Sequence, residues 1–487
     1  MLVIVGIVGV VLVFGIAVFV HELGHFLFAR LRGVGVEAFA IGMGPKIVAW
    51  KRGGTEYSLR WLPIGGFVRL HQMIREEAQP EPQEPIEAEA PAEGAAKPIS
   101  VGESVHADME ALYDKGFITK LLVFGGGVFF NYLTAIAATA LLLSIGFERP
   151  LLEAWVGLVT SPELQSAGLQ MDDRIVEIEG MAVGHLGDFD KAFVNAIDSG
   201  KSKDALDVKV RRGGEIAALK LPPAPDRKTP PYFNEKGEAV FGFDWEFAPY
   251  VGPVIPYRPA AKAGLKEGDL ILEVNGEQVD RWSAVKAKIE TSVNDGMTLK
   301  VRRLPKNNEG EAAVFTISMV PEESPDDPKR GQIGMLPGAE KMERVRLPVL
   351  QALAKAPGDT TKTLVGIAAV TFGTFGKAFK TGNFKSLKRD VGGPLVIFNV
   401  TYNTAQKGFA ELLQWFINLN LILAIMNLLP IPILDGGFIL LSSIEAVVRR
   451  PVPVKVLTPI YTFFFFCFIT LLVLVSYQDI MNIFFRR

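Results

Sequence analysis

Three ionisable side chains stand inside the apolar N-terminal stretch: His21, Glu22 and His25. Leu2–Val20 carries no charge, and apolar residues resume over Phe26–Ala29. A segment of this length can cross a bilayer as one helix, and ionisable groups at such depth usually mark function. One helical turn separates the two imidazoles, so both can bind one zinc ion, with Glu22 placed to deprotonate a water on it. A chance match is the alternative, but nothing else would offset burying three such groups in a span.

The third ligand of the predicted metal site lies far along the chain, at Asp435. A catalytic zinc ion takes three protein ligands and keeps one position for water. Asp435 is the only acidic residue between Leu412 and Ser443. Its alternative role is that of an acidic N-cap where a helix restarts after two prolines, and the two roles are compatible. No comparable apolar setting surrounds the remaining histidines, which are His71, His106 and His185.

The two motifs together resemble those of the site-2 protease family of intramembrane zinc metalloproteases. They are H-E-x-x-H in a first transmembrane helix and N-x-x-P-x-x-x-x-D-G much later. A Gly-rich second span ending in Asn131 and an apparent pair of PDZ domains are similar to the RseP-like branch, although Gly127 stands where proline is usual. The resemblance makes Glu22 the catalytic base. It also implies a single Zn²⁺ cofactor bound by His21, His25 and Asp435.

Two asparagines in these motifs are candidate substrate-positioning residues. Asn131 either hydrogen-bonds between helices, which is the commoner use of Asn in a span, or contacts the substrate backbone. Asn427 either contacts the substrate backbone or satisfies a carbonyl freed by Pro430. Their positions in the motifs favour substrate contact for both.

Composition limits the class of protein. At 487 residues the chain is too long for one domain. Its mean hydropathy of +0.26 makes it too apolar for an ordinary soluble protein. The net charge of −2 says nothing about nucleic acid, and without a basic stripe with interleaved aromatics no nucleic-acid partner is expected. A single cysteine, Cys467, excludes internal disulfides and a thiolate zinc site. The N-terminal run lacks the features of a cleaved signal peptide and is expected to remain.

The predicted fold is an α-helical polytopic membrane protein with about four transmembrane helices, a membrane-associated β region and two extracytoplasmic PDZ-like α+β domains. Short aromatic and β-branched runs at Val36–Trp50 and Thr55–Leu70 predict a hairpin. In the family such a sheet pairs with the substrate as an added strand; a plain cytoplasmic hairpin is the alternative. The predicted segments are 1–30, first span; 31–75, β region; 76–115, acidic linker; 116–148, second span; 149–245 and 246–340, PDZ-like domains; 341–410, linker with an interfacial helix; 411–448, third transmembrane region; and 449–487, cytoplasmic link and fourth span.

An internal repeat organises the soluble segment. Ala167–Gly180 returns as Ala263–Gly276, offset by 96 residues. The repeat is similar to the PDZ signature of bacterial proteases, whose domains capture extended peptide ends by strand addition. In the first copy, Asp172 stands where the PDZ signature usually has glycine, so the turn of this copy can differ from that of the second. The pair is expected to bind peptide ends or to act as a size filter, with mere spacing as the alternative.

Charge patterning gives a topology. The stretch 30–75 holds eight Lys or Arg against two Glu, which by the positive-inside rule makes it cytoplasmic. Four spans then leave both termini and the PDZ-like domains outside, and bring His21 and Asp435 to matching depth near the cytoplasmic face. Residues 364–379 suit an interfacial amphipathic helix better than a fifth crossing. The acidic, Pro- and Ala-rich segment 76–115 reads as a disordered linker without chemistry.

The function expected from the resemblance is hydrolysis of peptide bonds within or near transmembrane segments. It implies a multi-pass enzyme of the bacterial inner membrane that acts in regulated intramembrane proteolysis. Its partners would be the bilayer and single-span substrates such as anti-sigma factors, trimmed after a first protease has acted. Two other classes stay open: a non-catalytic membrane-anchored PDZ scaffold, and a zincin whose active site lies outside the membrane.

Overall fold

The computed structural model describes residues 2–71, 111–226, 229–232, 241–304, 311–324, 327–381 and 392–481. The chain divides into two units, a helical unit of Met1–Phe147 with Arg346–Arg486, and a β-rich unit of Glu148–Val345. Most of the predicted acidic linker, including His106, lies outside the described residues.

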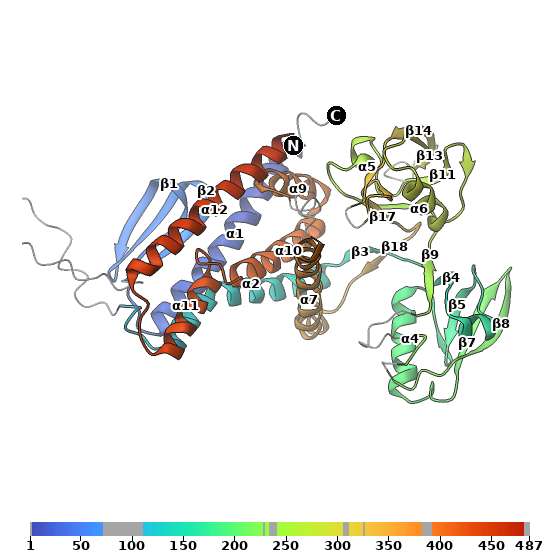
Figure 1. The fold of residues 1–487 in the computed structure, drawn as a ribbon, viewed down its shortest axis with the longest axis horizontal. Helices are drawn as coiled ribbons and strands as arrows, with labels where there is room; N and C mark the ends of the chain where they lie inside the picture. Colours follow the sequence, from blue (N-terminus) through green and yellow to red (C-terminus); the bar gives the residue numbers. More distant parts are fainter. Residues whose placement is uncertain are drawn as a thin grey trace, which may run out of the picture. The chain divides into compact units, whose positions relative to one another are not determined.

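Long apolar helices build the helical unit (Figure 1). Four of the described helices are long and apolar enough to cross a membrane: α1 (Leu2–Leu31), α2 (Phe117–Ile145), α10 (Phe409–Leu428) and α12 (Val454–Ile480). This fits the predicted polytopic membrane fold. The third transmembrane region is broken, because α10 ends at Leu428 and α11 (Asp435–Val448) begins a new helix at the predicted restart.

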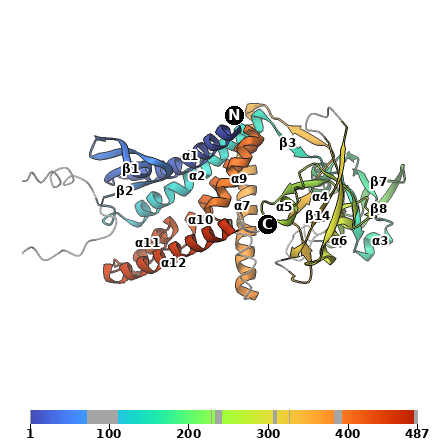
Figure 2. The same ribbon diagram turned by 90° about the horizontal axis from the view of Figure 1, so that it is seen from above.

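Helix α7 (Val349–Thr381) contains the predicted interfacial helix 364–379 but begins fifteen residues earlier. It runs across α2 and α10 in both views (Figures 1 and 2). Hydroxyls fix the crossing, since Thr360 donates to Thr139 at 2.9 Å and the Tyr132 and Thr361 hydroxyls lie 2.7 Å apart. Helix α7 is not among the described helices that are long and apolar enough to cross a membrane.

Helix α9 (Pro394–Lys407) packs along α1. An added Cβ at Gly6 would overlap the ring of Tyr402, so the two helices approach closely there. Asp479, buried near the end of α12, accepts the backbone N–H groups of Leu395 and Val396 at 3.1 and 3.2 Å. A side chain more than eighty residues away thus caps α9, which has no side-chain cap of its own.

The predicted hairpin forms a compact sheet beside α1. It consists of β1 (Val36–Arg52) and β2 (Thr55–Leu70), with positive-φ glycines Gly53 and Gly54 at the turn. Both strands bend, so Ala38 pairs with Arg69 on one side and with Glu56 on the other. The end of β2 therefore forms an edge of the sheet, next to α1.

The two copies of the repeat fold alike in the β-rich unit. The first copy has the sheet order β8-β7-β5-β4-β9 with helix α4 (Leu186–Asp198), and the second has β12-β11-β13-β14 with α6 (Trp282–Thr291). The strands of the first copy are β4 (Trp155–Val159), β5 (Arg174–Ile178), β6 (Met181–Ala182), β7 (Leu206–Arg212), β8 (Glu215–Leu221) and β9 (Phe243–Glu246). Those of the second are β10 (Val251–Val254), β11 (Leu270–Val274), β12 (Glu277–Gln278), β13 (Met297–Arg303), β14 (Ala313–Met319), β15 (Glu322–Glu323), β16 (Gly331–Gln332) and β17 (Met335–Pro337). Two short helices, α3 (Pro162–Ser166) and α5 (Pro259–Lys262), occupy the same place in each copy.

The turn at Asp172 corrects one expectation. Asp172 adopts φ 66°, close to the φ of 90° at the matching Gly268, so the turn is the same in both copies. Aspartate is among the few residues that tolerate this left-handed conformation. Its carboxylate also pairs with Arg281 of the second copy at 2.9 Å, which a glycine could not do.

Each copy also contains the same ion pair between a buried aspartate and a partly exposed arginine. Arg212 donates two hydrogen bonds to Asp173, both of 2.7 Å, and Arg303 donates two to Asp269, both of 2.6 Å. The two aspartates are buried, and each arginine also donates to the carbonyl of a repeat glycine. The sequence repeat is thus matched by a repeated structure.

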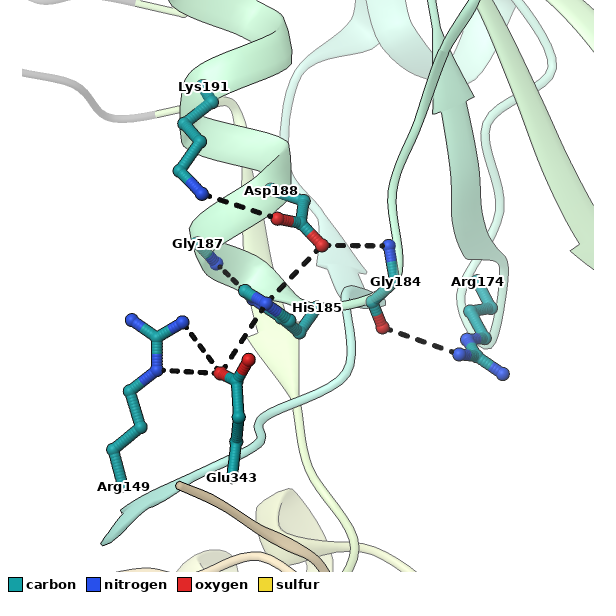
Figure 3. A network of polar contacts seen from close by, with 8 residues as sticks. All are labelled: Arg149, Arg174, Gly184, His185, Gly187, Asp188, Lys191 and Glu343. Carbon is teal, nitrogen blue, oxygen red and sulfur yellow. Dashed lines mark hydrogen bonds and ion pairs between the residues drawn. The ribbon is translucent and has the colours of Figure 1, made fainter. Parts of the chain in front are cut away.

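A polar network joins the strands that lead into and out of this unit to the first copy (Figure 3). Strand β3 (Phe147–Pro150) pairs with β18 (Met342–Val345), and Arg149 on β3 contacts Glu343 on β18 at 2.7 Å. His185 caps α4 by accepting the N–H of Gly187, and its Nε2 lies 3.3 Å from Asp188 and 3.9 Å from Glu343. His185 therefore has a structural role.

Candidate metal centre

Two helices from opposite ends of the chain bring the predicted ligands together. His21 and His25 lie one turn apart on α1, and Asp435 is the first residue of α11. The Asp435 Oδ2 atom lies 3.2 Å from Nε2 of His21 and 3.3 Å from Nε2 of His25, and the two Nε2 atoms are 3.3 Å apart. Both histidines are only 8% exposed. Among the described residues, these three form the only cluster of at least three potential metal-ligating side chains.

The triangle has the size of a tetrahedral zinc face. Zinc bonds of about 2.0–2.1 Å at the tetrahedral angle hold their ligand atoms roughly 3.3 Å apart. The three observed edges of 3.2–3.3 Å match this spacing. The Asp435 Oδ2 atom is buried and accepts no hydrogen bond from the described residues. A shared cation would satisfy it, so the side chains present fit a metal ion.

Each imidazole is oriented by a polar group of α2 at its Nδ1 atom, on the far side of the ring from Asp435. The Nδ1 atom of His25 lies 2.8 Å from the carbonyl oxygen of Val123 on α2, an acceptor only, so Nδ1 carries the proton. Its Nε2 is then left with a lone pair for a metal. This is the usual arrangement of a metal-binding histidine, in which the second ring nitrogen donates to a carbonyl or carboxylate.

Asn131 has the same place behind His21. Its Nδ2 lies 3.2 Å from His21 Nδ1, while its Oδ1 is buried with no partner among the described residues. The amide O and N of an asparagine are assigned from the hydrogen bonds around them. With the two exchanged, Oδ1 accepts from the His21 Nδ1–H, which gives His21 the tautomer of His25. Asn131 is 0% exposed, which favours the inter-helix hydrogen bond over the substrate contact predicted from its motif position.

Glycines let α1 and α2 approach closely enough for these contacts. An added Cβ at Gly127 would lie 2.5 Å from His25 Nε2 and 2.7 Å from His21 Nδ1. Added Cβ atoms at Gly24 and Gly126 would each overlap the backbone of the other helix. Gly127, the residue that departs from the family motif, thus lies directly against both imidazole rings. Helix α2 continues through it unbroken.

The edge of the β sheet lies against Glu22. The backbone N–H of Val68 on β2 donates to the Glu22 carboxylate. An added Cβ at Gly66 would lie 3.2 Å from Glu22 Cγ, so the strand passes in contact with this side chain. The carboxylate next to the two imidazoles is therefore also next to the free edge of β2.

A family model described as Peptidase family M50 matches residues 9–472, nearly the whole chain. The chain belongs to peptidase family M50. This confirms the resemblance at the level of the family. A protein of Enterococcus faecalis named "Probable protease eep" is 27% identical over 486 residues, covering 98% of each chain. A "Putative zinc metalloprotease" of Vibrio cholerae is 28% identical over 460 residues, 92% of each chain, and one of Clostridium perfringens is 25% identical over 96% of each.

The remaining predicted residue of this family M50 chain, Asn427, lies at the end of α10. Its Nδ2 is 3.5 Å from His21 Nε2, beside the ligand triangle rather than behind it. Of the other histidines, His71 contacts Glu37 at 2.9 Å in the β region, and His185 belongs to the β-rich unit. Neither joins the cluster, in agreement with their less apolar sequence settings.

Several residues of this M50 site were not predicted individually. They are the Val123 carbonyl, which orients His25, and Gly66 and Val68, which contact Glu22. A backbone carbonyl leaves no trace in the residue type, so no sequence signal could have revealed Val123. The pair Gly65-Gly66 inside a predicted strand was a usable signal, because glycine in a strand marks a close approach.

Proposed function

We propose that this chain is a zinc-dependent endopeptidase that cuts peptide bonds within or near the membrane-spanning segments of other proteins. The observation that carries the proposal is the triangle of His21, His25 and Asp435, built on apolar helices with Glu22 alongside. Family membership and the printed names of the relatives support zinc and proteolysis. Among the described residues, the β-rich unit contains no comparable cluster, which argues against an active site outside the membrane.

The mechanism follows from what the side chains can do. A bound zinc ion would act as a Lewis acid on the scissile carbonyl and lower the pKa of a water molecule. Glu22 accepts the proton of the attacking water and passes it to the leaving amine. The Val123 carbonyl keeps His25 in the tautomer that presents Nε2. Asn131, with its amide oxygen turned toward His21 Nδ1, does the same for His21. Asn427, whose amide lies beside the triangle, donates to the substrate backbone.

The sheet offers a way to hold the substrate. A peptide must be extended for its carbonyl to be reached, and an unpaired sheet edge binds extended peptide by strand addition. The end of β2 is such an edge, and it contacts Glu22 through Gly66 and Val68. A strand added there would pass directly by the catalytic base.

The biological setting is proposed from the family likeness. The chain would be an RseP-like multi-pass enzyme of the bacterial inner membrane, with its active site toward the cytoplasm. Single-span regulators such as anti-sigma factors would be its substrates, and the two repeat copies would be PDZ domains that bind peptide ends or filter substrates by size. The repeated α/β units and the four apolar helices support this assignment.

Metal content and cleavage measured together test the proposal. Purified Glu22→Gln should keep about one zinc per chain, by elemental mass spectrometry, and should lose cleavage of a single-span substrate by about a thousandfold or more, as when a general base is removed. Asp435→Ala should lose the metal. Full activity of Glu22→Gln would remove that residue from its role. Wild-type protein without zinc or cleavage would instead favour a non-catalytic scaffold.

A further inference from the structure

A cavity of about 390 Å³ opens in the helical unit, and none of the three predicted metal ligands lines it. Residues at the start of α2, on α11 and in the loop leading into α12 line it. Much of the lining is apolar, including Phe117, Leu441, Val454 and Leu457. The cavity can therefore hold a hydrocarbon chain.

Basic side chains outnumber acidic ones around this cavity. Lys115, Lys120, Arg449 and Arg450 line it, against Asp114 and Glu445. Glu445 is already engaged inside the protein. It lies 3.0 Å from Lys120 Nζ and accepts the backbone N–H of Val452 at 3.2 Å. The Arg449 and Arg450 side chains are exposed and make no hydrogen bond or ion pair with the described part of the chain. The cavity thus keeps a net positive rim.

Arg449 occupies a backbone position that usually favours glycine. It follows α11 directly and adopts φ 57° and ψ 28°, the left-handed conformation. Glycine at such a helix end is free of the steric cost that a side chain meets. An arginine here suggests that its side chain is used.

The position of the cavity indicates its ligand. Helices α2 and α12 are both candidate spans, and both begin at the cavity. It therefore lies where spans enter the bilayer, at the depth of lipid headgroups. The N-terminal ends of both helices, which are positive by the helix dipole, line the cavity without a side-chain N-cap, while the C-terminal end of α11 adds the opposite sign.

We propose that this cavity binds an anionic phospholipid, with the phosphate at Arg449 and Arg450 and an acyl chain along Leu441, Val454 and Leu457. Basic pockets between membrane helices are known to bind such headgroups. A soluble phosphate ester would use the arginines alone and would leave the apolar lining unfilled. The lipid accounts for both parts of the cavity.

Native mass spectrometry of the full-length protein in detergent tests this proposal. We expect phosphatidylglycerol to be retained in preference to phosphatidylcholine of the same chain length. The double substitution Arg449→Gln with Arg450→Gln should weaken retention about 25-fold, about fivefold for each lost charge. Ala446→Trp should also abolish it, because the indole would fill the cavity while every charge remains.

The matched control is Lys355→Gln with Lys362→Gln on α7, which removes the same charge from exposed positions outside the cavity. It should leave retention of the lipid unchanged. Equal retention of both lipids, or unchanged retention by the arginine or Ala446 variants, would overturn the proposal. Competition by glycerophosphoglycerol as strong as by the lipid would overturn it too, because the ligand would then be a soluble phosphate ester.

Discussion

Single residues behind the proposed ligands shape the candidate metal centre. His21 and His25 would point their Nε2 atoms at one spot only if each Nδ1 is occupied, and Asn131 and the Val123 carbonyl occupy them. Gly127 lies against both rings, and any side chain at this position would displace them. The site is thus fixed as much by these neighbours as by its ligands, as is common for metal-binding histidines.

Gly127→Ala should weaken zinc binding while leaving the helix intact. The new methyl group would overlap His25 Nε2, whose ring is held at its other nitrogen, so the triangle must open. Disturbing the surroundings of metal ligands costs about 10- to 100-fold in affinity. Competitive titration with a zinc chelator would measure the change. Gly125→Ala is the control, since an added Cβ there meets no atom within 4 Å. Equal effects of both substitutions would contradict the steric argument.

Substitutions of Asn131 distinguish its two amide orientations. If Oδ1 accepts the His21 Nδ1–H, Asn131→Asp keeps the acceptor and should bind zinc nearly as well as wild type. Asn131→Leu should lose about 10- to 100-fold in affinity, because the buried Nδ1–H would have no partner. The same chelator titration measures both. Weak binding by the Asp variant with normal binding by the Leu variant would show that Asn131 does not act through His21.

At the scale of elements, close helix contacts and repeated ion pairs hold the two units in shape. Helices α1 and α2 meet through Gly24 and Gly126, which brings the Val123 carbonyl and Asn131 to the imidazoles. In the β-rich unit, the guanidinium of Arg212 donates two hydrogen bonds to the Asp173 carboxylate. This contact raises the pKa of Arg212 above its usual range. Burial of that aspartate makes the pair a structural element of the first copy.

Arg212→Met should destabilise the first copy by about 2 to 3 kcal/mol. Removing one partner of a fully buried pair costs roughly 3–5 kcal/mol, and the partial exposure of Arg212 reduces this. The remaining Asp173 would be a buried, unpaired charge. Hydrogen–deuterium exchange of the full-length protein should show faster exchange in β5 and β7, with the second copy unchanged. Arg211→Met is the control, because Arg211 is the exposed neighbour on the same strand. Equal exchange in the two variants would show that the pair contributes little.

At the scale of the whole molecule, the candidate metal centre brings together segments that are far apart in sequence. His21 lies on the first helix, and Asp435 begins a helix near the other end of the chain. A bound metal ion would therefore link α1 to α11 inside the helical unit. The β-rich unit shares none of these ligands.

Removing the metal should loosen one unit only. With a strong chelator, the first turn of α11 and the His21 turn of α1 should exchange faster, because binding stabilises the bound state by about 4 kcal/mol at a thousandfold excess over Kd. Residues 148–345 should keep their exchange rates. Hydrogen–deuterium exchange with and without chelator, followed by zinc addition, checks this. A uniform loss of protection across both units would contradict a role confined to the helical unit.

The sequence by itself determined the local features of this protein. The helical period puts His21 and His25 on one face, hydropathy marks the spans, and the 96-residue offset marks two similar units. Asp435 could be singled out because a lone carboxylate in an apolar stretch needs a partner. These features depend on residues close together in the chain, which is why composition and spacing reveal them.

Only the tertiary structure decided which groups surround the ligands. Helix packing decides that the Val123 carbonyl and Gly127 contact the imidazoles. The bend of β2 decides that its edge lies beside Glu22. A shift of one residue in the packing of α2 would present different atoms to the imidazoles. Spacing within one segment does not specify such contacts between segments, because the fit of side chains and backbones across the interface sets them.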